Sequence, residues 1–272
     1  MNRKEATELA YNSLKNIMED AKAEAEWLVA LCLDIKRSEV YSLIDLTSEE
    51  FNEFEFVLKQ RQKKVPLAYI FHKTNFYGYD LEVNKNVLIP RAETEELVEI
   101  AIQYINKESE VLDIGTGSGA IAIAIQKETK AKVTAVDVSS SALKIAKKNA
   151  ASNESKIEFI CSNLFEKLEG RKFDVVVSNP PYISEDEYNE LDEGVKNFEP
   201  RLALCDNLDG LEFYRKIILN VKNHLKTNGK VFFEIGYNQA KDVEKLFLEN
   251  NFKNVTIKKD LEGNDRIVYA FI

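Results

Sequence analysis

The stretch VLDIGTGSGAIAIAI, residues 111–125, joins a short apolar run to a longer one through three glycines at every second position. The first run predicts a buried strand and the second a helix. Gly115, Gly117 and Gly119 permit a sharp turn and a close approach of the backbone to a ligand, while the start of the helix offers unpaired N–H groups. The stretch therefore predicts the first strand, ligand loop and helix of an α/β sheet.

The chain around this loop alternates between expected strands and expected helices. We expect helices near 93–106, 118–128, 140–151, 210–225 and 238–250, and strands at VLDI, KVTAVDV, IEFIC, FDVVVS, KVFFEI, NVTIKKD and RIVYAFI. Such repeated units imply a mostly parallel sheet covered on both faces. The last two strands are separated only by LEGND, which is too short for a parallel crossover, so this pair must be antiparallel.

The first part of the chain, from residue 3 to about 64, has apolar residues at helical spacing. Thr47 and Glu50 have the spacing of a capping box, and we expect Pro66 to stop the helix that follows them. No chemical motif lies in this part. We interpret residues 1–72 as a helical bundle that docks a substrate or covers a site.

The segment KTNFYGYDLEVNKNVLIP, residues 73–90, contains aromatic residues, a glycine and an asparagine-rich turn between two β-type runs. This pattern predicts a β-hairpin that links two domains. Residues 91–272 then form the main domain.

The composition excludes several classes of function. A formal net charge of −9 opposes non-specific attraction to a phosphate backbone. Three cysteines and two histidines lack ligand spacing, which argues against a disulfide framework and against a metal site.

No window approaches the roughly 18 uninterrupted apolar residues of a membrane span. Because the first twenty residues show no signal or transit peptide, the cytoplasm is the expected location.

Asp137 ends the strand VTAVDV about twenty residues after the glycine loop, where an acid can hold the two hydroxyls of a ribose. A glycine-rich turn can also exist for tight packing alone, but the strand context and Asp137 favour a nucleoside ligand. The spacing G-x-G-x-G, with Asp113 just ahead, departs from the G-x-G-x-x-G of dinucleotide enzymes. It resembles the loop of methyltransferases that use S-adenosylmethionine.

A second motif, Asn179-Pro180-Pro181-Tyr182, follows the strand FDVVVS, whose carboxyl end we expect beside the glycine loop. Two prolines make a stiff segment whose carbonyls stay free to accept hydrogen bonds. Asn179 and the Pro180 carbonyl can hold both hydrogens of a planar nitrogen and aim its lone pair at a sulfonium methyl. Tyr182 would supply a flat apolar wall. The plainer alternative is a rigid turn, which the position after a buried strand disfavours.

The sequence Asn-Pro-Pro-Tyr together with a glycine loop is shared by methyltransferases that act on planar nitrogens, including DNA adenine enzymes and protein glutamine enzymes. A wider set of segments resembles the bacterial peptide chain release factor glutamine methyltransferases, the PrmC or HemK family. These segments are PLAYI at 66, LIPRAETEELVE at 88, LDIGTGSGAIA at 112, AVDVSSSAL at 135, SNPPYI at 178, EPRLAL at 199, DGLEFYRKI at 209, FFEIG at 232 with Gln239, and DLEGNDRIV at 260.

The resemblance covers about residues 66 to 272 and implies a Rossmann-like methyltransferase domain of seven strands, mostly parallel with the last antiparallel, beside a small N-terminal helical domain. It implies that Asn179, Pro180 and Tyr182 are catalytic and that, with Pro181, they hold the glutamine of a Gly-Gly-Gln loop in a release factor. The residues implied to hold S-adenosylmethionine are Gly115, Thr116, Gly117, Ser118, Gly119, Asp137, Asn163, Leu164 and Asn179, of which Asn163 and Leu164 would lie near the adenine.

Two positions depart from the family pattern, which usually has Pro at Ala92 and Asp at Asn163. The first change could loosen a lid-like segment over the methyl donor, and the second leaves only the backbone N–H for the adenine. The segment RAETEELVE fits a plain helix start as well as it fits a direct role for Arg91 or Glu93. We interpret EIGYNQ, after the strand KVFFEI, as structural.

Three functions remain open from the sequence. The first is methylation of the glutamine side-chain amide in a release factor. The second is a nucleic-acid adenine methyltransferase, which must extract its base from a stack, although the sequence has no obvious basic tract for such a partner. The third is a non-catalytic S-adenosylmethionine-binding regulator on the same fold, against which the intact Asn179-Pro180-Pro181-Tyr182 weighs. We expect no direct nucleic-acid, membrane or metal partner.

Overall fold

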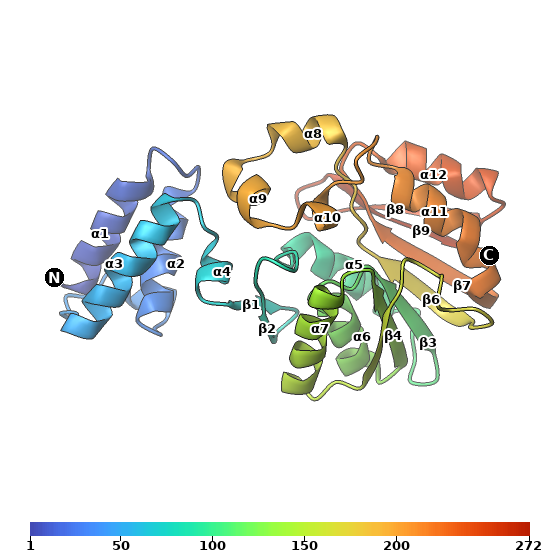
Figure 1. Ribbon diagram of the computed structural model, residues 1–272, viewed down its shortest axis with the longest axis horizontal. Helices are drawn as coiled ribbons and strands as arrows, with labels where there is room; N and C mark the ends of the chain where they lie inside the picture. Colours follow the sequence, from blue (N-terminus) through green and yellow to red (C-terminus); the bar gives the residue numbers. More distant parts are fainter. The chain divides into compact units, whose positions relative to one another are not determined.

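A computed structural model describes all 272 residues, which divide into two compact units. The smaller unit comprises Met1–His72 together with Asp192–Phe198, and the larger comprises Lys73–Leu191 and Glu199–Ile272. The chain therefore leaves the larger unit for a short segment and then returns to it. Figure 1 labels the elements of both units along the chain.

The smaller unit is helical, as the sequence predicts. Its elements are α1 (Arg3–Leu14), α2 (Ala21–Cys32), the 3-10 turn η1 (Arg37–Glu39), α3 (Ser48–Gln62), α4 (Leu67–Ile70) and α9 (Glu193–Phe198). Helices α1, α2 and α3 contribute Leu14, Leu28 and Phe54 to one apolar core, where each is at most 1% exposed. Burying such large apolar side chains stabilises the bundle by about 1.5–3 kcal/mol each.

The expected capping box is present at the start of α3. Glu50 N donates to Thr47 Oγ1 at 3.2 Å, and Thr47 N donates to Glu50 Oε2 at 2.7 Å. Helix α3 ends at Gln62, ahead of the expected stop at Pro66, and Pro66 is also the N-cap of α4. Proline suits a helix start because the first N–H groups of a helix have no partner within it.

The larger unit contains all the strands. They are β1 (Lys73–Phe76), β2 (Tyr79–Glu82), β3 (Glu110–Ile114), β4 (Lys132–Asp137), β5 (Ile157–Cys161), β6 (Phe173–Ser178), β7 (Leu225–Glu234), β8 (Lys253–Lys259) and β9 (Asp265–Phe271). Its helical elements are α5 (Ala92–Ile102), α6 (Ala120–Thr129), α7 (Ser140–Ser152), α8 (Glu185–Glu190), α10 (Arg201–Leu204), α11 (Glu212–Val221), η2 (Lys222–His224) and α12 (Ala240–Glu249).

Seven strands form one sheet in the order β5-β4-β3-β6-β7-β9-β8. Pairs among β3 to β7 are parallel, whereas β9 is antiparallel to both of its neighbours. The predicted Rossmann-like sheet with an antiparallel last strand is therefore confirmed. Because β4 and β6 lie on opposite sides of β3, the chain reverses direction across the sheet at β3, which is where open α/β sheets bind ligands.

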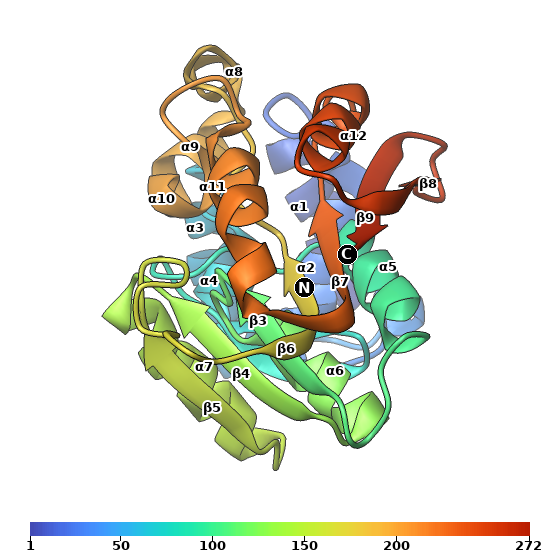
Figure 2. The same cartoon turned by 90° about the vertical axis from the view of Figure 1, so that its right-hand side faces the viewer.

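Both faces of the sheet are covered, because successive side chains of a strand point to opposite faces. On β3, Val111 belongs to a core with α5 and α6, while Leu112 belongs to a second core with α11 and α12. Figure 2 shows these two layers of helices on either side of the sheet. The near-continuous apolar strands of the sequence follow from this double coverage.

The hairpin of residues 73–90 differs in detail from the sequence prediction. Strands β1 and β2 pair with Phe76 opposite Tyr79, so the turn is Tyr77–Gly78 and not the asparagine-rich segment, which follows β2. Gly78 and Tyr77 both have positive φ, a conformation that glycine adopts without strain. The hairpin belongs to the larger unit, where Glu82 N donates to Asn149 Oδ1 at 2.7 Å.

None of the helices combines the length and the apolar character needed to cross a bilayer.

We predict that Leu112→Ala lowers the free energy of unfolding by about 2–5 kcal/mol, because it opens a cavity beneath the central strand. Leu219→Ala, on a side chain of α11 that is 69% exposed, should change it by about 0.5 kcal/mol or less. Urea denaturation followed by circular dichroism measures both, since the single tryptophan, Trp27, reports only on the smaller unit. Equal losses in the two variants would contradict the core position of Leu112.

Candidate active site

Four neighbouring strands of the sheet end at the same level. Their register pairs Ile114 with Val136, Ile114 with Ser178, and Ser178 with Phe233. The glycine loop therefore emerges at the same edge as Asp137, Asn179 and Glu234, which end or follow the neighbouring strands. The sequence prediction that the two motifs meet at this edge follows from the parallel pairing of β3 and β6.

The glycine loop is shaped for a close ligand. Gly115, Gly117 and Gly119 have φ of 74°, 54° and 85°, a region that other residues enter with strain. A Cβ on Gly115 would meet no atom within 4 Å, whereas one on Gly119 would lie 3.2 Å from the Cβ of Ala146. The first glycine thus leaves open space beside the backbone, and the third permits α6 to pack against α7.

Asp137 both lines the cavity and stabilises the glycine loop. Its Oδ2 accepts a hydrogen bond from Gly117 N at 2.9 Å, and its Oδ1 accepts one from Ser139 N at 2.8 Å. Burial raises the pKa of Asp137, while these backbone donors oppose the rise. A carboxylate has about four acceptor positions on its two oxygens, so Asp137 can also accept from a ligand hydroxyl.

One cavity collects most of the residues expected at the site. Its walls are Asn86, Val87, Leu88, Ile114, Gly115, Gly117, Val136, Asp137, Val138, Ser139, Ala142, Ser162, Asn163, Leu164, Ser178, Asn179, Pro180, Pro181, Pro200, Leu202, Ala203, Phe213 and Ile217. Asp137 is the only charged residue among them. Such walls suit an uncharged or cationic nucleoside and offer no cation for a pyrophosphate.

Four of the expected residues lie outside these walls, namely Thr116, Ser118, Gly119 and Tyr182. The Thr116 hydroxyl donates to Asp113 Oδ2 at 2.6 Å, and burial raises the pKa of Asp113 to about 7. Ser118 is buried, and its carbonyl accepts a hydrogen bond from Asn149 Nδ2 at 2.9 Å. Thr116 and Ser118 therefore hold the loop in shape.

Asn163 and Leu164 line the cavity where the adenine was expected. The Asn163 side chain is exposed and donates to Glu166 Oε1 at 2.8 Å. The NH2 end of the Asn163 amide is thus engaged by Glu166, and Leu164 offers apolar surface to a base.

The segment after β6 is anchored through its side chains. Asn179 Nδ2 donates to Thr94 Oγ1 at 3.1 Å, and the Thr94 hydroxyl donates to Glu234 Oε2 at 2.6 Å. The ring of Tyr182 packs against the core under α11 and α12, and its hydroxyl donates to Glu234 Oε1 at 3.4 Å. Burial raises the pKa of Tyr182. Tyr182 is thus held by its ring and its hydroxyl outside the cavity walls, and its role as a flat wall over the substrate stays a prediction.

Gln239, in the segment EIGYNQ, has a structural role. Its Nε2 donates to the carbonyls of Tyr182 at 2.8 Å and Gly210 at 3.1 Å, and its Oε1 accepts a hydrogen bond from Gly236 N at 2.9 Å. A Cβ on Gly210 would collide with the Tyr182 carbonyl. Glycine is therefore required at 210 because the chain there lies directly against the backbone of the second motif.

Arg91 and Glu93 lie at the start of α5, where the sequence left their role open. Arg91 is the N-cap residue, and Glu93 and Glu95 lie in the first turn. Arg91 Nη2 forms an ion pair with Glu199 Oε1 at 2.5 Å, and the Glu199 side chain is only 2% exposed. Arg91 therefore ties α5 to the chain that leads into α10.

Sequence reasoning missed three groups of residues in or beside the cavity. Asn86, Val87 and Leu88 come from the segment after β2, and Leu202 and Phe213 come from α10 and α11. These residues belong to no sequence motif, because the mostly apolar side chains of a cavity wall have no distinctive type or spacing in the sequence. Thr94 and Glu234 were also missed, although both lie in segments, LIPRAETEELVE and FFEIG, that the resemblance had marked.

Two family models match the chain. The family described as "Methyltransferase small domain" matches residues 94–195, and the one described as "PrmC N-terminal domain" matches residues 5–71.

Several relatives are similar over most of the chain. A protein of Fusobacterium nucleatum named "Release factor glutamine methyltransferase" is 43% identical over 264 residues, covering 94% of this chain and 75% of that protein. Proteins of the same name are 40% identical in Flavobacterium psychrophilum, covering 94% of each, and 38% identical in Clostridium acetobutylicum, covering 99% of this chain and 98% of the relative.

Solved structures of methyltransferases share the fold. A ribosomal protein L11 methylase from Lactobacillus delbrueckii subsp. bulgaricus has a TM-score of 0.53 at 25% identity, covering 70% of this chain and 82% of its own. A methyltransferase from Pyrococcus furiosus has a TM-score of 0.58 at 21% identity, with coverage of 78% and 98%. The second likeness concerns the fold alone.

Proposed function

The chain belongs to the release factor glutamine methyltransferase family, and we propose that it methylates the glutamine of the Gly-Gly-Gln motif in a release factor. The acceptor would be the side-chain amide nitrogen, and the methyl donor S-adenosylmethionine. The observation that carries the proposal is that the glycine loop, Asp137 and the segment Asn179–Pro181 line one cavity. A binding site for a nucleoside and a binding site for a planar nitrogen would therefore lie in the same cavity.

The residues of the cavity fit the proposed methyl donor. Asp137 offers its remaining acceptor positions to ribose hydroxyls, and Leu164 and Phe213 offer apolar surface to an adenine. The open space beside Gly115 would accept the methionine part. When bound, S-adenosylmethionine supplies an electrophilic methyl group on a sulfonium.

Asn179 and Pro180 would prepare the acceptor nitrogen. An amide nitrogen is a poor nucleophile because its lone pair is delocalised into the carbonyl. If Asn179 Oδ1 and the Pro180 carbonyl accept its two hydrogens, they orient the nitrogen and stabilise the positive charge that builds on it. As the nitrogen forms its bond to the methyl carbon, the carbon–sulfur bond of the donor would break and its electron pair would stay on sulfur. The nitrogen would then lose one proton to solvent, so no strong base is required before transfer.

A methyl-transfer assay tests the proposal against its alternative. Purified release factor and duplex DNA are each supplied with labelled S-adenosylmethionine and the enzyme, and the modified residue is identified by mass spectrometry. We expect the label on the glutamine of the Gly-Gly-Gln motif. Label on DNA alone would identify an adenine methyltransferase, and binding of the donor with no transfer to either would identify a regulator.

The smaller unit has no catalytic motif, and we propose that it helps to dock the release factor. Exposed apolar side chains support a docking role, since Trp27 is 48%, Leu43 76% and Phe56 58% exposed. Exposed apolar side chains of this size supply the apolar surface that a protein partner can bury.

We predict that Asp137→Ala weakens the affinity for S-adenosylmethionine about ten- to a hundredfold, because a charged acceptor worth about 1.5–3 kcal/mol is lost. The loss of its bonds to Gly117 and Ser139 adds to the effect by loosening the loop. Isothermal titration calorimetry measures the affinity. Asp242→Ala, in the first turn of α12, is the control that should bind as the wild type does. Unchanged affinity in Asp137→Ala would refute the ribose contact.

Asn179→Ala should leave the affinity for S-adenosylmethionine nearly intact and slow methyl transfer by about a hundred- to a thousandfold, as loss of one aimed polar group does. Single-turnover kinetics with release factor gives the rate, and calorimetry gives the affinity. A rate close to that of the wild type would mean that Asn179 is purely structural.

Deleting residues 1–64 should reduce methylation of whole release factor far more than methylation of a short Gly-Gly-Gln peptide, since remote contacts position the reacting amide only in the whole factor. Because Asp192–Phe198 belongs to the same unit as the deleted helices, circular dichroism and donor affinity must first show that the remainder is folded. Equal losses on both substrates would argue against docking by this unit.

A further inference from the structure

The proposed methyl transfer requires Asn179 to present its carbonyl oxygen to the acceptor nitrogen. The two ends of a primary amide have nearly the same shape, so packing alone does not choose between them. In the structure, Asn179 Nδ2 donates to Thr94 Oγ1 at 3.1 Å, which leaves Oδ1 as the free end of the amide. The orientation of the amide therefore depends on what Thr94 can accept.

Thr94 has one hydroxyl hydrogen, and that hydrogen is already used. It is donated to Glu234 Oε2 at 2.6 Å, and both residues are buried, at 4% and 1% exposure. A hydroxyl that has given away its hydrogen can only accept further bonds. Thr94 therefore accepts the NH2 group of Asn179 and would reject its carbonyl.

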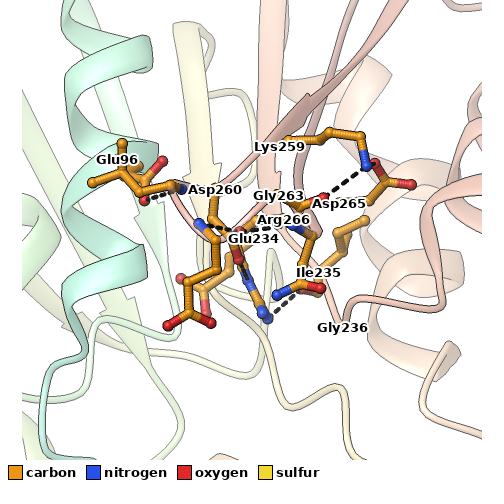
Figure 3. Close-up of polar contacts among 12 residues, drawn as sticks. Glu96, Glu234, Ile235, Gly236, Lys259, Asp260, Gly263, Asp265 and Arg266 are labelled. Atoms are coloured by element: carbon orange, nitrogen blue, oxygen red, sulfur yellow. Dashed lines mark hydrogen bonds and ion pairs between the residues drawn. The ribbon is translucent and has the colours of Figure 1, made fainter.

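Glu234 sets the direction of this relay because an ionised carboxylate only accepts hydrogen bonds. It is the last residue of β7, and the Tyr182 hydroxyl also donates to it at 3.4 Å. The guanidinium of Arg266, on β9, is held beside it by Asp260 and by the carbonyl of Ile235, as Figure 3 shows. This cation favours the ionised form of Glu234.

We infer that Glu234 and Thr94 are positioning residues, which together turn the carbonyl of Asn179 toward the methyl acceptor. Neither residue lines the cavity, so both act through Asn179 and not on the substrate. The inference rests on the proposed function, because the required orientation comes from the planar nitrogen of the acceptor. It gives a role to Glu234, a buried acid that has no other part in the proposed methyl transfer.

The relay should respond to pH. The groups that face Glu234 are Arg266 from β9, Glu93 from α5, Tyr182 after β6 and Tyr214 from α11. Burial raises the pKa of Glu234 from 4.5 to about 7, although the Thr94 hydrogen bond and Arg266 oppose the rise. As the pH falls through about 7, Glu234 becomes protonated and can donate to Thr94. The hydrogen bond to Thr94 then no longer determines which end of the Asn179 amide faces the methyl acceptor.

The same shift makes a prediction about stability. Between pH 4.5 and about 7 the folded state holds a proton on Glu234 that the unfolded state has released. The contribution of this group to stability is therefore greatest at low pH and declines as the pH rises through this window. Ionisation of Glu234 in the folded state, at a pH above about 7, therefore lowers stability relative to the protonated form.

Three threonine variants test the relay by single-turnover methyl transfer. Thr94→Val removes the hydroxyl at constant volume and should slow transfer about ten- to a hundredfold, because the acceptor amide is no longer aligned. Thr94→Ser should recover most of the rate. Thr134→Val, at a buried threonine of β4 away from the cavity, is the matched control that should leave the rate unchanged. A normal rate in Thr94→Val would overturn the inference.

Glu234→Gln tests the direction of the relay, because its NH2 group can donate to Thr94. We expect at least a tenfold slower transfer at pH 8, a rate that no longer falls as the pH drops through 7, and a Tm at pH 8 equal to or above that of the wild type. A wild-type rate and an unchanged pH profile would overturn the inference. If this variant does not fold, the Thr94 pair decides the question.

A spectroscopic measurement separates this inference from the proposed function. The side-chain NH2 resonance of Asn179 should shift with a midpoint near pH 7 in the wild type and stay constant in Glu234→Gln. If the wild type methylates no release factor but shows this shift, the proposed function fails and the relay stands. A wild-type resonance that ignores pH would overturn the relay, whatever the substrate.

Discussion

The parallel pairing of β3 with β4 on one side and β6 on the other is the constraint on which the site depends. Parallel strands end at the same edge, and the chains that leave β3 and β6 turn to opposite faces of the sheet, so a crevice opens between them. The glycine loop and Asn179 lie on its two sides. The covering helices then complete the walls, with Leu164 and Phe213 as apolar surfaces.

Three acids with raised pKa values lie at or near this edge of the sheet. Burial raises the pKa of Asp113, Asp137 and Glu234, which means that the surroundings penalise their charged forms. Hydrogen bonds from the loop and from Thr94 offset part of this penalty. Proteins commonly retain destabilising charged groups at functional sites, where the charge and the orientation of a side chain serve function at some cost in stability.

The segment between the second motif and α11 was the hardest part of the chain to predict from the sequence. Residues 184–209 contain the short helices α8, α9 and α10, which no sequence pattern indicated. Helices of four to six residues have too few turns to show an apolar period. The hairpin turn was also misplaced, because Tyr77–Gly78 and the asparagine-rich segment are both acceptable turn sequences and only strand pairing distinguishes them.

The sequence by itself determined the order and type of the main strands and helices, the antiparallel last strand, and the two motifs with their acid, Asp137. These features are local, since periodicity, glycine spacing and loop length act within a few residues of one another. The tertiary structure alone decided that Tyr182 packs against the core with its hydroxyl on Glu234, and that Thr94 lies within hydrogen-bond reach of both Asn179 and Glu234. A hydrogen bond between residues 140 positions apart depends on sheet register and helix packing, which no local pattern encodes.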